Sequence, residues 1–162
     1  MGSSSVRDVV RLVVSIVVCQ LAGGIGAIFT SPAIPTWYAS LAKPAFQPPN
    51  WLFFPVWTTL YTLMGIAAFL VWRKGLDLRS VRVALGLFAV QLVLNTAWSI
   101  VFFGAQELFG ALIVIVILWL FILINIVTFW RISRVAGALL IPYILWVSFA
   151  SLLNYSVWML NP

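Results

Sequence analysis

Long uncharged stretches limit what this chain can fold into. Each of them is longer than the roughly 20 residues that a helix needs to cross the hydrocarbon core of a bilayer. They cover residues 12–42, 44–72, 83–106, 108–130 and 135–162. Because the apolar runs are continuous rather than alternating over segments of about 10 residues, a β-barrel is disfavoured. We therefore predict an all-α membrane protein, a five-transmembrane-helix bundle.

The expected helices leave only short connections between them. We place them near residues 10–30, 52–72, 82–103, 107–130 and 135–158. With 64% hydrophobic and 7% charged residues, the chain lies far from a soluble domain, which is about half apolar and a quarter charged. Residues 1–162 are thus expected to form a single transmembrane domain, with a lid-like loop over 31–51. We find no internal repeat, which counts against an inverted-repeat transporter.

The positive charges are distributed unevenly between the two sides of such a bundle. With five spans, the N-terminus shares its side with the loops between helices 2 and 3 and helices 4 and 5. That side carries Arg7, Arg11, Arg73, Lys74, Arg79, Arg82, Arg131 and Arg134, and the other side carries only Lys43. By the positive-inside rule the N-terminus is cytoplasmic and the C-terminus lies on the opposite side. The net charge of +6 therefore indicates membrane topology and contact with anionic lipids, not nucleic-acid binding.

The side chains needed for conventional catalysis are scarce. The chain has no histidine, and its three carboxylates, Asp8, Asp77 and Glu107, all fall at predicted membrane boundaries. Metal sites, paired carboxylates and a Ser-His-Asp arrangement are therefore not expected. The sequence indicates no required cofactor and no conventional enzyme, and any haem would bind without a histidine ligand.

Three of the predicted helices combine tryptophan with neutral polar groups on one face. At 100° per residue the side chains of each set fall on a common stripe. The sets are Trp57 with Tyr61 in the second helix, Asn95 with Trp98 in the third, and Trp146, Ala150 and Asn154 in the fifth. Such faces can line an uncharged aromatic cavity for a large planar ligand. A packed aromatic core without a cavity has the same periodicity, so both alternatives stay open. Gln91, on the same stripe as Asn95, is as well explained by a hydrogen bond between helices.

The segment 37–51, WYASLAKPAFQPPNW, interrupts the apolar runs. Its prolines favour extended or turn conformations over helix. We interpret it as a lid over the cavity, with Tyr38 as its ligand contact. The other lid residues are Trp37, Lys43, Pro44, Phe46, Pro48 and Pro49. Trp37 is also explained as an interfacial anchor, and Lys43 as a side chain that reaches lipid headgroups.

Four motifs in order along the chain resemble the TspO/MBR family, that of the tryptophan-rich sensory protein and the mitochondrial translocator protein (peripheral-type benzodiazepine receptor). They are WYASLAKPAFQPP (37–49), PVWTTLY (55–61), QLVLNTAWSIVFF (91–103) and LIPYILWVSFASLLNYSVWMLN (140–161). The resemblance implies a five-helix bundle, often a homodimer, in a bacterial membrane or, in a eukaryote, the mitochondrial outer membrane. It implies protoporphyrin IX, haem and related tetrapyrroles as ligands, sterols in eukaryotic members, and synthetic benzodiazepine-type ligands.

By motif position the resemblance also assigns site residues and functions. The implied pocket residues are Tyr38, Trp57, Asn95, Trp98, Trp146 and Ala150. A sensor or regulator of porphyrin metabolism is the expected function, with a porphyrin or sterol transporter as one alternative. Light-dependent porphyrin degradation, in which Trp57 and Trp146 would take part, is the other. Because no Lys or Arg follows Tyr155, the sterol motif credited to mammalian members is incomplete.

Overall fold

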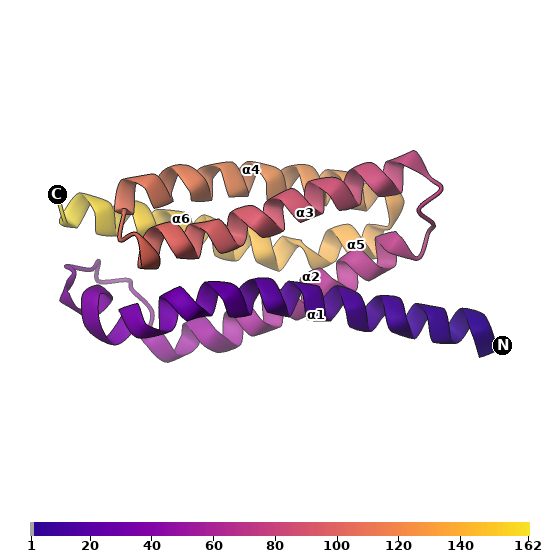
Figure 1. The fold of residues 1–162 in the computed structure, drawn as a ribbon. Coiled ribbons are helices and arrows are strands. Elements are labelled where there is room, and N and C mark those ends of the chain that lie inside the picture. The colour runs from indigo at the N-terminus through magenta and orange to yellow at the C-terminus, as the bar shows by residue number, and fades with distance from the viewer. Residues whose placement is uncertain (1) are drawn as a thin grey trace.

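The computed structural model describes residues 2–162 and confirms the all-helical bundle (Figure 1). The elements are α1 (Gly2–Ala33), η1 (Ile34–Tyr38), η2 (Asn50–Leu52), α2 (Phe53–Trp72), α3 (Arg79–Ser99), η3 (Ile100–Gly104), α4 (Leu108–Ile132), α5 (Arg134–Leu139) and α6 (Ile141–Leu160). Taken with their continuations, they form five helices within this range that are long and apolar enough to cross a membrane. No strand occurs between residues 2 and 162.

The first helix continues well past its predicted end. The expected loop over 31–51 was wrong in its first part, because α1 passes through Pro32 into the π-helical turn η1 and the chain leaves the helix only after Ser40. Prolines are tolerated in a membrane helix when local π-turns and hydroxyl side chains satisfy the carbonyls that the prolines leave free. Here the Thr36 hydroxyl donates to the carbonyl oxygen of Pro32 at 2.7 Å. The irregular connection is therefore confined to residues 41–49.

The fifth span is interrupted near its start, between α5 and α6. Leu140, with φ −88° and ψ −8°, separates α5 from α6, and Pro142 stands in the first turn of α6. A proline in that turn gives up an N–H that would have no partner within the helix. The break thus allows the chain to change direction at little cost in hydrogen bonds.

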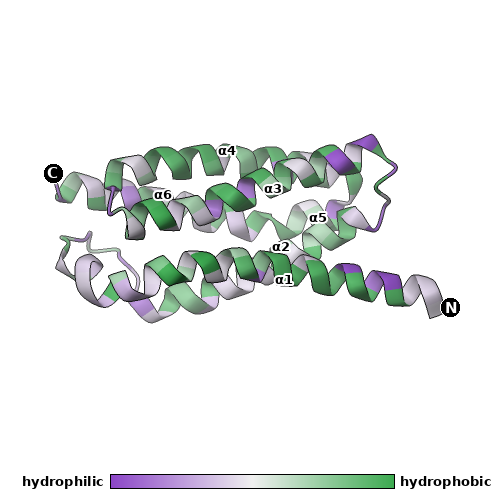
Figure 2. Ribbon diagram, in the orientation of Figure 1, coloured by the Kyte–Doolittle hydropathy of each residue, from purple (hydrophilic) through white to green (hydrophobic). Residues whose placement is uncertain are grey.

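The packing leaves the two termini at opposite ends of the bundle. Helix α1 packs on α2 and α3, and α4 packs on α3, α5 and α6. The N-terminus lies at the end that also holds the α2–α3 and α4–α5 connections, whereas the C-terminus lies beside the α1–α2 loop (Figure 1). Hydrophilic residues are concentrated near the ends of the helices, and the strongest concentration is at the N-terminal end (Figure 2). This arrangement fits a multi-pass membrane protein with an odd number of spans.

Candidate ligand-binding cavity

A chain of buried hydrogen bonds connects α2, α3 and α6 at the centre of the bundle. Tyr61 donates to Oδ1 of Asn95, and Asn95 Nδ2 donates to the Tyr143 hydroxyl at 2.8 Å. The Tyr143 hydroxyl in turn donates to Gln91 Oε1 at 2.7 Å. All four side chains are buried, so these bonds take the place of hydrogen bonds to bulk water. Gln91 therefore joins helices, as one of its two interpretations predicted, and the network fixes the orientation of Tyr61.

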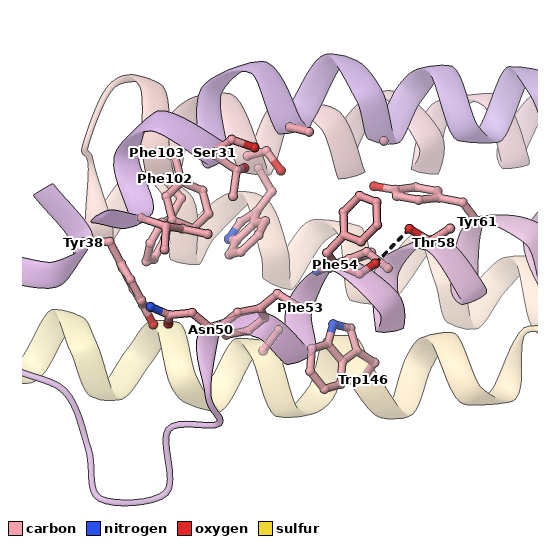
Figure 3. A pocket seen from close by; sticks show the side chains of 18 of the residues that line it. Ser31, Tyr38, Asn50, Phe53, Phe54, Thr58, Tyr61, Phe102, Phe103 and Trp146 are labelled. Atoms are coloured by element: carbon pink, nitrogen blue, oxygen red, sulfur yellow. Dashed lines mark hydrogen bonds between the residues drawn. The ribbon is translucent and has the colours of Figure 1, made fainter. Parts of the chain in front are cut away.

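A cavity of about 350 Å³ lies beside this network, between α1, α2, α3, η3 and α6. Figure 3 shows aromatic side chains from several of these elements turned toward one space. Most of the residues singled out in the sequence line it, namely Tyr38, Trp57, Tyr61, Trp98, Trp146, Ala150 and Asn154. The alternative of a packed aromatic core without a cavity is therefore wrong for this region.

Asn95 is the exception among those residues. It is 2% exposed and is not one of the residues that line the cavity. Tyr61 stands between Asn95 and the cavity and takes up the Asn95 carbonyl oxygen. The stripe in the third helix indicated correctly that Asn95 faces inward. The stripe did not show that a tyrosine from α2 covers it.

Helix α1 supplies a wall of the cavity that the sequence analysis did not assign to the site. Gln20, Gly23, Gly24 and Ala27 line the cavity. A Cβ atom at Gly23 would overlap the ring of Tyr61, so the absence of a side chain there brings the two helices together. At Gly24 a Cβ would meet nothing within 4 Å. The small residues Gly23, Gly24 and Ala27 were therefore the sequence feature from which this wall of the cavity could have been predicted.

The aromatic rings of the cavity wall pack on one another both stacked and edge to face. Trp57 stacks on Tyr61 with ring centroids 5.6 Å apart, and it meets Trp146 edge to face at 6.5 Å. Phe53 lies edge to face with Trp146 at 6.1 Å. Edge-to-face and offset arrangements are the favourable ones for aromatic pairs. Flat ring surfaces from α2 and α6 thus meet at a corner of the cavity.

The polar groups of the wall are mostly satisfied by other protein groups. Trp98 Nε1 donates to Asn154 Oδ1 at 3.0 Å, and Asn154 Nδ2 donates to the carbonyl of Leu108 at 3.0 Å. Trp146 Nε1 is buried and has no partner among the described residues. No group of three or more metal-ligating side chains occurs within residues 2–162. The arrangement can therefore hold a large apolar ligand and offers one unused indole N–H.

Apart from Tyr38, the proposed lid residues do not line the cavity. Trp37 packs edge to face on Phe102 at 5.8 Å, and Phe46 packs on Phe149 of α6 at 6.2 Å. Pro44 accepts a bond from the Gln47 N–H at 3.1 Å in a tight turn, and Pro48 and Pro49 lead into η2. The loop 41–49 lies against α6, while its flanking residues Tyr38 and Asn50 line the cavity.

Comparison with known proteins identifies relatives over nearly the whole chain. The model of the TspO/MBR family matches residues 15–159. Tryptophan-rich protein TspO of Chlorobaculum tepidum is 43% identical over 156 residues, covering 96% of this chain and 99% of that protein. Protein CrtK of Rhodobacter capsulatus is 46% identical, covering 90% and 89%. Translocator protein of Homo sapiens is 42% identical, covering 75% and 73%.

Proposed function

Because this chain belongs to the TspO/MBR family, we propose that it is a membrane receptor for tetrapyrroles such as protoporphyrin IX and haem. The observation that carries the proposal is the aromatic, uncharged cavity that residues of α1, α2, α3, η3 and α6 line. A planar macrocycle gains most from flat aromatic walls and from exclusion of water. The bound state would report porphyrin levels to other components, which makes the protein a sensor or regulator.

Stacking on two indoles is the proposed basis of binding. Trp57 and Trp146 come from different helices and lie nearly perpendicular, at 87°. A macrocycle lying against one ring face therefore meets the edge of the other. Aromatic contacts of this kind contribute about 0.5–1.5 kcal/mol each beyond buried area. Several of them, with the Phe53 and Tyr61 rings, supply affinity without any metal ligand from the protein.

The cavity is open on the side between α1 and α2. Gly24, Phe54 and Thr58 line it and are exposed. In a bilayer this side would face lipid, so a macrocycle longer than the cavity can extend through it. The proposed orientation, with the basic end of the bundle in the cytoplasm, places the cavity toward the opposite half of the membrane.

Quenching of tryptophan fluorescence tests the proposed function. Protoporphyrin IX added to the protein in detergent micelles is expected to quench the emission saturably. Trp146→Leu should weaken binding by about 2- to 12-fold, the equivalent of one aromatic contact. Trp130→Leu, at an exposed tryptophan near the other end of the bundle, is the matched control and should leave the affinity unchanged. Quenching that does not saturate, or equal affinities in both variants, would refute binding in this cavity.

A second candidate function is light-dependent oxidation of a bound porphyrin by dioxygen. One observation favours it: Trp57 and Trp146 both line the cavity that would hold the porphyrin. An indole there can pass an electron to the photo-excited porphyrin, which passes it on to dioxygen, and the reduced oxygen species formed beside the macrocycle then oxidises it. Illumination of the complex should then bleach the porphyrin absorption band faster than illumination of free porphyrin. Equal bleaching in a Trp57→Phe, Trp146→Phe variant with porphyrin still bound would remove this function.

A further inference from the structure

The walls of the cavity contain no charged side chain. Every residue that lines it is apolar, aromatic, hydroxylic or an amide. A carboxylate buried among such groups without a partner costs several kcal/mol or takes up a proton. An acidic ligand can therefore occupy the cavity as an anion only if its carboxylate lies next to a positive charge.

One cation stands next to the cavity. Lys43 Nζ lies 4.9 Å from the centre of the Tyr38 ring, and Tyr38 lines the cavity. The other lysine and the arginines belong to the N-terminal half of α1 and to the helix ends and connections at α2–α3 and α4–α5, at the far end of the bundle (Figure 1). At the Tyr38 end, the only other charged side chain among residues 2–162 is the carboxylate of Glu107.

The ammonium group of Lys43 has bonding capacity to spare. It donates to the backbone carbonyls of Leu41 at 3.1 Å and Ala39 at 3.4 Å. An ammonium group carries three N–H donors, so one remains for a further acceptor. Among the described residues the only ion pair within 4.0 Å is that between Arg11 and Asp8. Lys43 therefore keeps an uncompensated charge at a fixed place beside the cavity.

We propose that Lys43 is the charge-recognition residue of the cavity. Its ammonium group pairs with a carboxylate that a bound ligand presents at the Tyr38 end. The site then selects planar amphiphiles with acidic arms over their neutral counterparts, and it orients them with the acidic edge toward the loop 41–49. This inference rests on the proposed function and adds to it the chemical class and the direction of the ligand.

The ammonium group of Lys43 is held in place before a ligand binds. The bonds from Lys43 to Ala39 and Leu41 hold the side chain back against the end of η1, over the ring face of Tyr38. An ammonium group over an aromatic face is attracted to it and loses little by remaining there. The charge is thus positioned before a ligand arrives, which lowers the ordering cost of binding.

Comparing an acidic porphyrin with its neutral ester tests the proposal. Protoporphyrin IX and its dimethyl ester share the macrocycle and differ in the charge of the two arms. Both are titrated into the wild type and into Lys43→Met in zwitterionic detergent, and the ratio of the ester Kd to the acid Kd is compared. Partitioning into micelles affects each ligand equally in both proteins, so the change in the ratio isolates the contribution of Lys43.

We expect this ratio to fall about five-fold in Lys43→Met, as a half-buried ion pair would produce. Lys43→Arg should retain the preference for the acid. Lys74→Met removes the same charge from the exposed cytoplasmic end and should leave the ratio as in the wild type. High salt should reduce the preference in the wild type and have little effect in Lys43→Met.

Two results would overturn the inference. The first is an equal ratio in the wild type and Lys43→Met, which would leave Lys43 as a side chain that contacts only lipid headgroups. The second is an equal fall in Lys43→Met and Lys74→Met, which would indicate a general effect of net charge. Failure of the proposed function itself looks different, because then neither the acid nor the ester binds saturably to any variant.

Discussion

The side chain of Asn161 holds Ala42 by two reciprocal hydrogen bonds across 119 positions of sequence. The Ala42 N–H donates to Asn161 Oδ1 at 3.0 Å, and Asn161 Nδ2 donates to the Ala42 carbonyl at 2.8 Å. The side-chain amide of Asn161 thus pairs with both backbone groups of Ala42, as a strand partner would in a sheet. This pairing attaches the start of the loop 41–49 to the end of α6. Since Tyr38 and Asn50 flank this loop and line the cavity, the contact also fixes the end wall of the site.

Asn161→Ala should therefore loosen the loop without unfolding the helices. Hydrogen–deuterium exchange followed by mass spectrometry is expected to be faster over residues 41–49 and unchanged over α2–α4. Ser156→Ala is a suitable control, because the Ser156 hydroxyl bonds only the Leu152 carbonyl of its own helix. Unchanged exchange of the loop in Asn161→Ala would show that Phe46 on Phe149 is sufficient to anchor it.

Tyr143→Phe should destabilise the bundle by leaving two buried groups unpaired. The hydroxyl both accepts from Asn95 and donates to Gln91, and all three side chains are buried. We expect a loss of about 1–3 kcal/mol in the free energy of unfolding, measured by thermal or SDS denaturation in micelles. Tyr155→Phe is the control, since Tyr155 is 47% exposed. Equal stability of the two variants would show that the network contributes little.

Gly65→Ala should push α1 and α2 apart. A Cβ atom there would lie 2.6 Å from the Ile16 Cα and 2.9 Å from its backbone nitrogen, and backbone atoms cannot rotate away. Overpacking of this kind costs about 1–3 kcal/mol. Gly86→Ala is the opposite case, because a Cβ at Gly86 meets nothing within 4 Å. Helix propensity then favours alanine by about 0.5–1 kcal/mol. Denaturation curves that shift in the same direction would contradict this close contact.

Gly24→Phe should obstruct the open side of the cavity. Gly24 lines the cavity, and its Cβ would have free space, so a ring can be added without straining the fold. We expect the affinity for protoporphyrin IX to fall about ten-fold, equivalent to roughly 1.4 kcal/mol. Gly86→Phe adds the same ring at an equally open position on α3 and serves as the control. Wild-type affinity in Gly24→Phe would mean that the ligand does not use this opening.

The five spans and the inward faces of three helices were predicted from the sequence, but the end of the first helix was placed too early. The loop was expected to begin at residue 31, whereas the helix continues past Pro32 and through η1 to Ser40. In lipid an open loop leaves backbone groups without partners, so a π-turn supported by the Thr36 hydroxyl is the better solution. The number of prolines in a segment does not show whether such a π-turn or a loop forms.

Hydropathy and helical period determined the span count, the basic end and the side of each helix that faces inward, because these depend on single residues and local spacing. Which inward-facing side chains meet was decided only by the tertiary structure. Tyr61 covers Asn95, Gly23 admits the Tyr61 ring, and Asn161 reaches Ala42, all across gaps of 34 to 119 positions. Such contacts depend on the rotation and depth of one helix against another. The packing of entire helix surfaces fixes this rotation and depth, and neither produces a periodic pattern in the sequence.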